Sequence, residues 1–308
     1  MTLTCFRYLV ALAHERHFGR AAEKCGVSQP TLSIAIKKLE EELDVQLFER
    51  AANEVRITEI GRRIVAQVEK AMIAVDHIRE IALSGKDPLV GSLRVGVIYT
   101  IGPYLLPRLI PKVHQRAPHM PLIIQENYTS RLVELLKRGE LDVIIVSLPF
   151  AESGVVTLSL YDEPFRVLLP AGHLWVKRKE ITPRMLANEQ LLLLGAGNCF
   201  RDQVLEICPD CQNGGSLQRT LEGSSLETIR HMVATGLGVT VLPSTAADGL
   251  ETNNPLMAIR PFARPEPMRR VILAWRVTYP RAGVIDMLRK AVLDSSLPGV
   301  HPIKPVDV

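Results

Sequence analysis

Residues 17–50 read HFGRAAEKCGVSQPTLSIAIKKLEEELDVQLFER, and this stretch decides the fold of the N-terminal part. Gly26 interrupts a helical pattern, Ser28 suits an N-cap, and Pro30 is tolerated in the first turn of the helix that follows. Apolar residues recur at helical spacing on both sides of this break, at Phe18, Ala21, Ala22, Leu32, Ile36, Leu39 and Leu43. The stretch therefore predicts a helix, a tight turn and a second helix.

The flanking residues extend this pattern into a small domain. A helical stripe precedes it, at Phe6, Leu9, Val10 and Ala13. After it, FERAANEVRIT at 48–58 places polar residues between Arg50 and Arg56 and predicts a two-stranded hairpin. A helix-turn-helix followed by a hairpin is a winged helix-turn-helix, which we expect over residues 1–58.

A long amphipathic pattern follows at residues 59–88. Its apolar residues alternate steps of three and four over about three heptads, at Ile60, Ile64, Val68, Ala71, Val75, Ile78 and Ala82. The pattern predicts a linker helix that dimerises the chain, and SGKDP at 84–88 marks its end. A helix that packs only on its own domain stays open as the alternative.

Residues 89–308 alternate strand and helix patterns, which predicts an α/β domain with a mostly parallel sheet. A first set of buried strands is expected at LRVGVI (93–98), PLIIQE (121–126) and DVIIVSL (142–148), with RLVELLKRG (131–139) as a helix between them. A second set is expected at FRVLLP (165–170), LLLLGAG (191–197), GVTVLP (238–243) and RVILAWR (270–276). These sets predict two lobes, lobe I at about 89–161 and 268–308 and lobe II at about 162–267, with a cleft between them.

Composition narrows the class of protein but does not name a partner. The chain of 308 residues is 47% hydrophobic and 23% charged, as in ordinary globular proteins. Its net charge of +4 is too small to indicate nucleic acid, and residues 1–63 hold ten basic against nine acidic side chains. No apolar segment approaches the roughly 20 residues of a membrane span, and the first residues are too polar for a secretory signal. We expect a cytoplasmic protein that does not enter a membrane.

The start of the second helix carries candidate DNA-reading side chains. Short polar residues there suit the end of a recognition helix that enters the major groove. The candidates are Ser28, Gln29, Pro30, Thr31, Ser33 and Lys37, with Arg50 and Arg56 added on the hairpin. Gln can pair with adenine, Ser and Thr can reach base edges or phosphates, and Lys can contact guanine or phosphate. An ordinary solvated helix face remains the alternative for these residues taken alone.

The segment GAGNCFRDQVLEICPDC at 195–211 carries the candidate chemistry of the second half. It places Cys199 near a helix N-terminus with Arg201 close by, and both favour a thiolate. A thiolate attacks peroxide to give a sulfenic acid, which a second cysteine can convert to a disulfide. Nine helical residues would separate Cys199 and Cys208 by ~13.5 Å between Cα atoms, whereas a disulfide needs about 4.4–6.8 Å. Oxidation would therefore require this helix to unwind.

Residues 17–50, together with Thr58 and Gly61, resemble the signature of LysR-type transcription regulators, and the similarity extends along the chain. The resemblance implies a regulator rather than an enzyme, without a cofactor. It further implies binding of double-stranded promoter DNA as a homo-oligomer, commonly a dimer of dimers, with RNA polymerase as a partner and an effector domain of periplasmic-binding-protein fold.

The run NCFRDQVLEIC resembles the peroxide-sensing OxyR branch of that family. That resemblance makes Cys199 the sensor, Cys208 its resolving partner and hydrogen peroxide the signal. It also assigns Thr100, Thr129 and Arg269 to the peroxide pocket, although Arg270 adjoins Arg269. Asn198 and Arg201, beside the sensor, complete the predicted pocket. Asn198 departs from the family, since many members have His there, and Asn cannot exchange a proton near neutral pH.

Two other functions stay open beside peroxide sensing, and so does the role of Cys211. A LysR-type regulator could bind a small metabolite between its lobes, or the chain could be a thiol peroxidase. Cys211, which forms a CxxC with Cys208, could be inert, form a competing disulfide or share a metal with Cys199. We expect no metal site, because no nearby His or fourth Cys completes a ligand set, and we expect Cys5 and Cys25 in the core.

Overall fold

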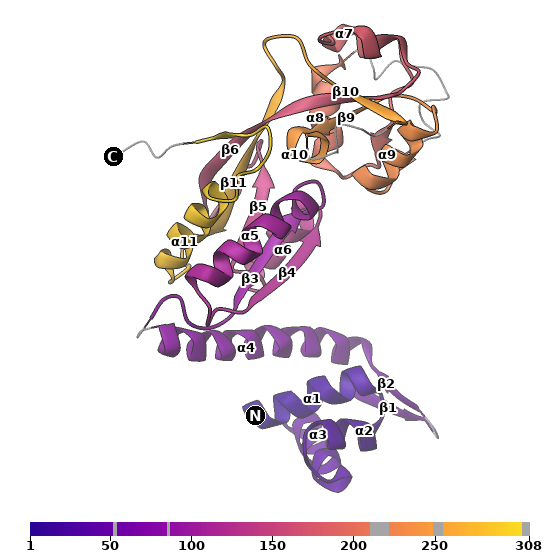
Figure 1. Cartoon of the computed structure of the whole chain (residues 1–308). Coiled ribbons are helices and arrows are strands. Elements are labelled where there is room, and N and C mark those ends of the chain that lie inside the picture. The colour runs from indigo at the N-terminus through magenta and orange to yellow at the C-terminus, as the bar shows by residue number, and fades with distance from the viewer. Residues whose placement is uncertain (52–53, 85–86, 210–221, 249–254, 304–308) are drawn as a thin grey trace. The chain divides into compact units, whose positions relative to one another are not determined.

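The computed structural model describes residues 1–51, 54–84, 87–209, 222–248 and 255–303. The chain divides into two compact units, Met1–Ala82 and Leu83–Val308 (Figure 1). This division falls at the end of the long helix. The finer domain boundaries expected at residues 58 and 88 remain predictions.

The N-terminal unit is a winged helix-turn-helix, as the sequence predicts. Its elements are α1 (Leu3–Glu15), α2 (Phe18–Lys24), α3 (Gln29–Leu43), β1 (Phe48–Ala51), β2 (Glu54–Ile57) and α4 (Glu59–Ser84). Ser28 caps α3 by accepting a hydrogen bond from the Thr31 backbone N–H at 3.3 Å, with Pro30 in the first turn. The predicted stripe of α3 is buried in the core at Leu32, Ile36 and Leu39.

The hairpin is tied to the helices by specific contacts. Glu40 on α3 accepts hydrogen bonds from the backbone N–H groups of Leu47, at 2.7 Å, and Phe48, at 3.1 Å. Thr58 caps the start of α4 by accepting from the Gly61 N–H at 2.9 Å. A Cβ at Gly61 would lie 2.3 Å from the Leu47 carbonyl oxygen, so only glycine allows this close approach. Thr58 and Gly61 are therefore needed where α4 meets the hairpin.

The long helix α4 uses only part of its apolar stripe within its own unit. Val65 and Val68 are buried in the core of the N-terminal unit, and Ile64 packs against it. Ile60 is 38% exposed and Ile78 is 65% exposed. The helix thus packs on its own domain around Ile64 to Val68 and leaves apolar side chains exposed on either side of that stretch.

The C-terminal unit is an α/β domain. Its strands are β3 (Leu93–Ile98), β4 (Leu122–Asn127), β5 (Val143–Ser147), β6 (Val155–Pro170), β7 (Leu193–Leu194), β8 (Glu222–Gly223), β9 (Thr240–Pro243), β10 (Met257–Pro261), β11 (Met268–Arg276) and β12 (His301–Pro302). Its helices are α5 (Gly102–Arg116), α6 (Thr129–Arg138), η1 (Leu174–Lys177), α7 (Pro183–Leu186), α8 (Cys199–Ile207), α9 (Leu226–Ala234), α10 (Ser244–Ala247) and α11 (Ala282–Leu293).

The main sheet is mixed, so the prediction of a mostly parallel sheet is wrong. Its strand order is β10-β6-β11-β5-β3-β4, with β9 and β12 also paired to β6. Only the pairs of β3 with β4 and with β5 are parallel, while β11 and β6 pair antiparallel with every neighbour in this sheet. Fully buried strands are apolar throughout in either direction, so the sequence pattern could not distinguish the two pairings.

Two hydrophobic cores lie along β6 and β11. The first gathers side chains of β3, β5, α5, α6 and α11, and the second gathers those of β9, α8, α9 and α10. Strand β6 joins them, because its Leu160 and Tyr161 belong to the first core and its Phe165 and Val167 to the second (Figure 1). The two cores correspond to two lobes linked by β6 and the returning β11.

One predicted strand is much shorter than expected. The run LLLLGAG at 191–197 forms only the two-residue β7 and an isolated bridge from Leu191 to Val239. Gly197 lies in the left-handed region, with φ at +90°, which ends extended structure before α8 begins. Among the helices that the structure describes, none is long and apolar enough to cross a bilayer.

Candidate functional site

The first turn of α3 presents most of the predicted DNA-reading residues to solvent. The exposed candidates are Ser28, Gln29, Pro30, Thr31 and Lys37. Ser33 is half-buried. The Ser28 hydroxyl is also shared with the Thr31 hydroxyl, 2.8 Å away, and Lys37 lies 3.7 Å from the Glu41 carboxylate. The face is polar and solvent-accessible, and only Ile34, which is 68% exposed, adds a large apolar side chain to it.

The predicted wing is the β1–β2 hairpin. Arg56 lies on β2 with an exposed side chain and pairs in register with Glu49 of β1. Arg50 lies on β1, paired in register with Val55, and its side chain is outside the described part of the structure. The backbone therefore carries both arginines on the two strands of the wing.

The candidate thiol, Cys199, is the first residue of α8. Its sulfur lies 3.7 Å from the hydroxyl of Thr129, at the start of α6, and 3.7 Å from the hydroxyl of Ser147, at the end of β5. Both hydroxyls belong to the first lobe, whereas α8 packs in the second. The thiol therefore lies where the two lobes meet.

Cys199 and Cys208 are not bonded to each other. Cys199 is a free, half-buried thiol, and Cys208, which follows the last residue of α8, is buried and carries a disulfide. The other free cysteines of the described residues are Cys5 and Cys25, both half-buried. Cys211 lies outside the described residues. Because α8 is an unbroken helix from Cys199 to Ile207, it holds the two cysteines at opposite ends.

A small cavity of ≈ 10 Å³ adjoins the thiol, with room for about one water-sized molecule. It is lined by Ile98, Tyr99, Thr100, Asn127, Tyr128, Thr129, Gly197, Asn198 and Cys199. Tyr99 and Tyr128 contact each other edge to face, with ring centroids 5.4 Å apart, and both are 41% exposed. Three predicted pocket residues, Thr100, Thr129 and Asn198, thus share one cavity with Cys199.

Asn198 precedes α8 at its N-cap position but does not cap it through its side chain. Its side-chain amide instead donates a hydrogen bond to the Gly195 carbonyl oxygen at 3.0 Å. Asn198 is 7% exposed. The amide therefore braces the Gly195–Gly197 turn beside the cavity.

The two predicted arginines point to partners other than the sulfur. Arg201 donates to the Leu194 carbonyl oxygen at 2.8 Å and pairs with Glu222 at 2.5 Å. Arg269 donates to the Thr100 hydroxyl at 2.8 Å and to the Thr100 carbonyl oxygen at 2.9 Å. Arg269 thus reaches the cavity wall through Thr100, and the hydrogen-bond contacts that the structure gives for the Cys199 sulfur are with the Thr129 and Ser147 hydroxyls.

Arg269 is also the centre of a buried network that crosses between the lobes. It forms an ion pair with Glu163 of β6 at 2.7 Å, and both side chains are 0% exposed. The other Glu163 oxygen accepts hydrogen bonds from the backbone N–H and the hydroxyl of Thr245 in α10. The Arg269 guanidinium lies 5.3 Å from the Phe200 ring centroid, next to Cys199 on α8. This network links β6, β11, α10 and α8 to the wall of the cavity.

A second contact joins the lobes at a titratable group. Tyr104 of α5 donates a hydrogen bond to the Glu227 carboxylate of α9 at 3.1 Å. Burial, followed by the Glu227 charge, raises the pKa of Tyr104 well above its ordinary value. Tyr104 therefore stays neutral and keeps its proton for this hydrogen bond.

Three residues of the site were not predicted from the sequence: Ser147, Gln203 and Glu163. Ser147 ends an apolar strand whose carboxyl end is where open α/β sheets bind ligands, so its position was a usable signal. Gln203 lies four residues after Cys199, on the same helical face. Glu163 showed no local signal, because its partners are distant in the chain.

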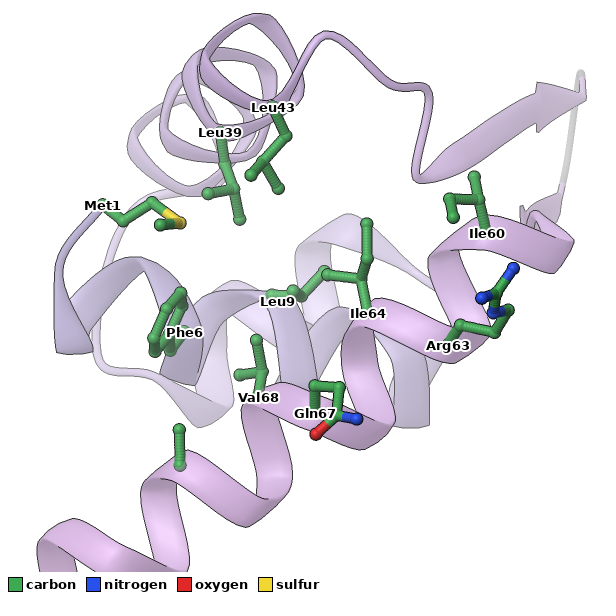
Figure 2. Close-up of a pocket in the computed structure, with 11 residues that line it drawn as sticks. Met1, Phe6, Leu9, Leu39, Leu43, Ile60, Arg63, Ile64, Gln67 and Val68 are labelled. Atoms are coloured by element: carbon green, nitrogen blue, oxygen red, sulfur yellow. The ribbon is translucent and has the colours of Figure 1, made fainter.

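An apolar pocket of ≈ 460 Å³ lies in the N-terminal unit, apart from these sites. Figure 2 shows Phe6 and Leu9 of α1, Leu39 and Leu43 of α3, and Ile64 and Val68 of α4 around it. Part of the apolar stripe of α4 therefore faces an open hollow. No group of three or more His, Cys, Asp or Glu side chains within the described ranges is placed to hold a metal ion.

Comparison with known proteins identifies the family. The sequence profile of the bacterial regulatory helix-turn-helix protein, lysR family, matches residues 3–62, and that of the LysR substrate binding domain matches residues 86–295. The chain belongs to the LysR family. One matched segment lies within each of the two units of the structure.

Similar proteins include activators of peroxide-inducible genes and solved OxyR structures. The "Hydrogen peroxide-inducible genes activator" of Dickeya chrysanthemi is 37% identical over 292 residues, covering 95% of each chain. A full-length OxyR of Pseudomonas aeruginosa is 52% identical, with a TM-score of 0.72 over 97% of this chain and 99% of that one. A Corynebacterium glutamicum OxyR mutant, described as H2O2-bound, is 32% identical, with a TM-score of 0.65 over 96% and 92% of the two chains.

Proposed function

We propose that this chain is a DNA-binding transcription regulator that senses hydrogen peroxide through a reversible Cys199–Cys208 thiol/disulfide switch and activates antioxidant genes. The observation that carries the proposal is the free Cys199 thiol at the first turn of α8, beside a water-sized cavity, with Cys208 at the other end of the same helix. The names of its OxyR relatives support the same signal.

The chemistry needs two cysteines and one peroxide. The Cys199 thiolate attacks one peroxide oxygen, an S–O bond forms as the O–O bond breaks, and the departing hydroxide takes a proton to become water. The Cys208 thiolate then attacks the sulfenic sulfur, so an S–S bond replaces the S–O bond and a second water leaves. Two thiols are oxidised and one peroxide is reduced to two waters. A cellular dithiol would reverse the change.

The helix between the cysteines converts this chemistry into a conformational signal. Nine residues of helix place their Cα atoms ~13.5 Å apart, well beyond the reach of a disulfide. Closure of the bond therefore requires α8 to unwind and to release its contacts with the first lobe. Phe200, Gln203 and Val204 are the buried residues that leave the core when it does.

DNA binding is assigned to α3 and the wing. Ser28, Gln29, Pro30, Thr31, Ser33 and Lys37 would enter the major groove or contact its edge, and Arg50 and Arg56 would reach phosphate or the minor groove. The partner is double-stranded promoter DNA, with RNA polymerase recruited there. A regulator with these partners acts in the cytoplasm.

The oligomer is a dimer of dimers in this proposal. The α4 stripe supports it, since Ile60 and Ile78 are exposed and the apolar pocket of Figure 2 opens beside Ile64 and Val68. An apolar hollow of this kind on an otherwise polar domain is suited to cover by a second copy of the helix.

A metabolite-binding regulator is the competing function. The cavity at Cys199 does not favour it, because ≈ 10 Å³ is too small for a metabolite. A thiol peroxidase is a third candidate function, and the presence of a winged helix-turn-helix unit argues against it.

The proposal is tested on fully reduced protein, since Cys208 must be a thiol before it can resolve Cys199. One equivalent of peroxide is added, disulfides are mapped by mass spectrometry, and promoter footprints are compared before and after. We expect a Cys199–Cys208 bond and an altered footprint. The Cys199→Ser variant should bind the promoter but lose the peroxide response completely.

Other outcomes would contradict the proposal in distinct ways. A footprint change that survives Cys199→Ser excludes sensing at this thiol. Pairing of Cys208 mainly with Cys211 excludes the proposed switch. Sustained turnover of peroxide with a simple thiol reductant, independent of DNA, favours the peroxidase. A footprint that responds to metabolites but not to peroxide favours the metabolite-binding regulator.

A further inference from the structure

Ser147 is a buried hydroxyl beside the candidate sensor that the proposed switch does not use. It is the last residue of β5, is 2% exposed, and places its Oγ 3.7 Å from the Cys199 Sγ. Either atom of this pair could be the donor on distance alone. The state of the sulfur decides between the two, because a thiolate carries no hydrogen to donate.

Gln203 is a second partner of the Ser147 hydroxyl. It lies one turn after Cys199 on α8, is 8% exposed, and its Nε2 donates to the Ser147 Oγ at 3.1 Å and to the Leu148 carbonyl oxygen at 2.7 Å. Exchanging the amide oxygen and nitrogen would oppose two acceptors at Leu148, so the amide has one allowed orientation. Its Oε1 has no hydrogen-bond partner within the described part of the chain.

The contact with Gln203 does not use the Ser147 hydrogen. A hydroxyl has one hydrogen to donate, and the Ser147 oxygen already accepts from Gln203. Its hydrogen is therefore free to point at the Cys199 sulfur, and a thiolate can only accept. Hydrogen bonds to an ionised group favour the ionised form. Thr129 approaches the same sulfur at the same distance as a second donor.

We propose that Ser147 donates a hydrogen bond to the Cys199 thiolate and that Gln203 is the positioning residue that orients it. The inference deepens the proposed function and rests on it for its biological meaning. Other polar groups near the sulfur are engaged elsewhere. The Asn198 amide donates to Gly195, Arg201 pairs with Glu222, and Arg269 pairs with Glu163.

The test compares Ser147→Ala with Ser295→Ala in the reduced full-length chain. Ser295 is also a buried serine, but its hydroxyl donates to the Ala291 carbonyl oxygen in α11, away from the thiol. The rates of Cys199 alkylation by iodoacetamide and of its oxidation by peroxide are followed by mass spectrometry of the Cys199 peptide over a range of pH. Circular dichroism confirms that each variant folds.

We expect Ser147→Ala to slow both reactions about tenfold at neutral pH, the factor for one hydrogen bond to a charged group. The difference should vanish at alkaline pH, where the thiol is ionised in both proteins. The ultraviolet absorbance of the thiolate at neutral pH should fall by a similar factor. Ser295→Ala should behave as the parent chain.

Gln203→Leu provides an independent variant. Without the amide, the Ser147 hydroxyl can turn to the Leu148 carbonyl oxygen. We therefore expect slower alkylation and oxidation of Cys199, with the same pH dependence as in Ser147→Ala. The double variant Ser147→Ala, Gln203→Leu should be no slower than Ser147→Ala alone, because both changes remove one interaction. Additive losses would overturn the positioning role of Gln203.

An unchanged neutral-pH rate in Ser147→Ala, or an equal loss at every pH, would overturn the proposal. An equal loss of rate in Ser295→Ala would also overturn the proposal. Iodoacetamide separates this result from the proposed function, because alkylation reports the thiolate whether or not peroxide alters DNA binding. Slower alkylation in Ser147→Ala, combined with a peroxide-insensitive footprint of the parent chain, would uphold this inference and refute the sensor.

Discussion

Two helices, α3 and α8, carry the two candidate sites at their N-terminal turns, and they differ in what surrounds those turns. Ser28 caps α3 with its side chain and leaves the first turn exposed. Asn198 stands at the same position of α8 without capping it, and the Cys199 sulfur there contacts residues of the other lobe. An exposed helix end can meet a large partner such as DNA, while an enclosed end can react only with a small molecule. The surroundings of each turn therefore separate the two functions.

The same contrast appears within one pair of strands. Glu163 and Arg269 pair across β6 and β11 with both side chains buried, while the adjacent pair Asp162 and Arg270 is 20% and 45% exposed. Successive residues of a strand point to opposite faces. The Glu163–Arg269 pair thus lies in the interior of the C-terminal unit, and the Asp162–Arg270 pair lies on its surface.

The largest expected effect comes from breaking the buried pair. Glu163→Gln leaves the Arg269 charge buried without its partner and should lower the free energy of unfolding by about 3–5 kcal/mol. Urea unfolding of the full chain, followed by tryptophan fluorescence, measures this change. Trp175 and Trp275, the two tryptophans, both lie in the C-terminal unit and report on it.

Asp162→Asn is the matched control for that variant. It breaks the exposed pair with Arg270 and should cost only about 0.2–1 kcal/mol. Equal losses in Asp162→Asn and Glu163→Gln would contradict the distinction between the buried and exposed faces of these strands.

A smaller effect is expected at the candidate DNA-binding residues of α3 and the wing. Ser33→Ala or Arg50→Ala should weaken promoter binding by about 1 kcal/mol, a factor of five, while peroxide-driven disulfide formation stays intact. Fluorescence anisotropy with promoter DNA and disulfide mapping measure the two properties on the same protein. If Arg50 contacts phosphate, its loss should also reduce the salt dependence of binding by about one unit of slope.

Loss of DNA binding and disulfide formation together would indicate misfolding rather than a lost contact. It would also contradict the view that the α3 site and the α8 site depend on separate residues.

The smallest effect concerns the pH dependence of stability. Glu126 on β4 has a buried Oε1 without a hydrogen-bond partner in the described residues, and burial raises the pKa of its carboxyl. The folded protein therefore binds this proton more tightly than the unfolded chain. Its stabilising contribution is complete below the ordinary carboxyl pKa and is lost as pH rises through the raised value.

The Glu126→Gln variant should not show this loss of stability as the pH rises. We expect its Tm to match the parent near pH 4 and to exceed it modestly at pH 7, with scanning calorimetry at both pH values as the measurement. Glu180→Gln, at an exposed position, serves as the control and should change neither Tm. A Glu126→Gln variant less stable than the parent at pH 7 would contradict the assignment.

Local patterns determined the elements well. The helix-turn-helix, the hairpin, α4, α6 and α8 lie close to where the sequence placed them, since capping residues and the helical period act within one turn of chain. The direction and length of the strands could not be predicted as well from the sequence. The antiparallel return of β11 and the shortness of β7 depend on pairings with distant segments.

The sequence by itself determined the LysR signature, the exposed polar turn of α3 and the separation of Cys199 from Cys208 along one helix. Each of these depends on residues that are neighbours in the chain. Only the tertiary structure decided that Arg269 rather than Arg270 reaches Thr100, and that Ser147 rather than an arginine contacts the sulfur. Those contacts join residues more than fifty positions apart, so the packing of the two lobes creates them and no local pattern encodes them.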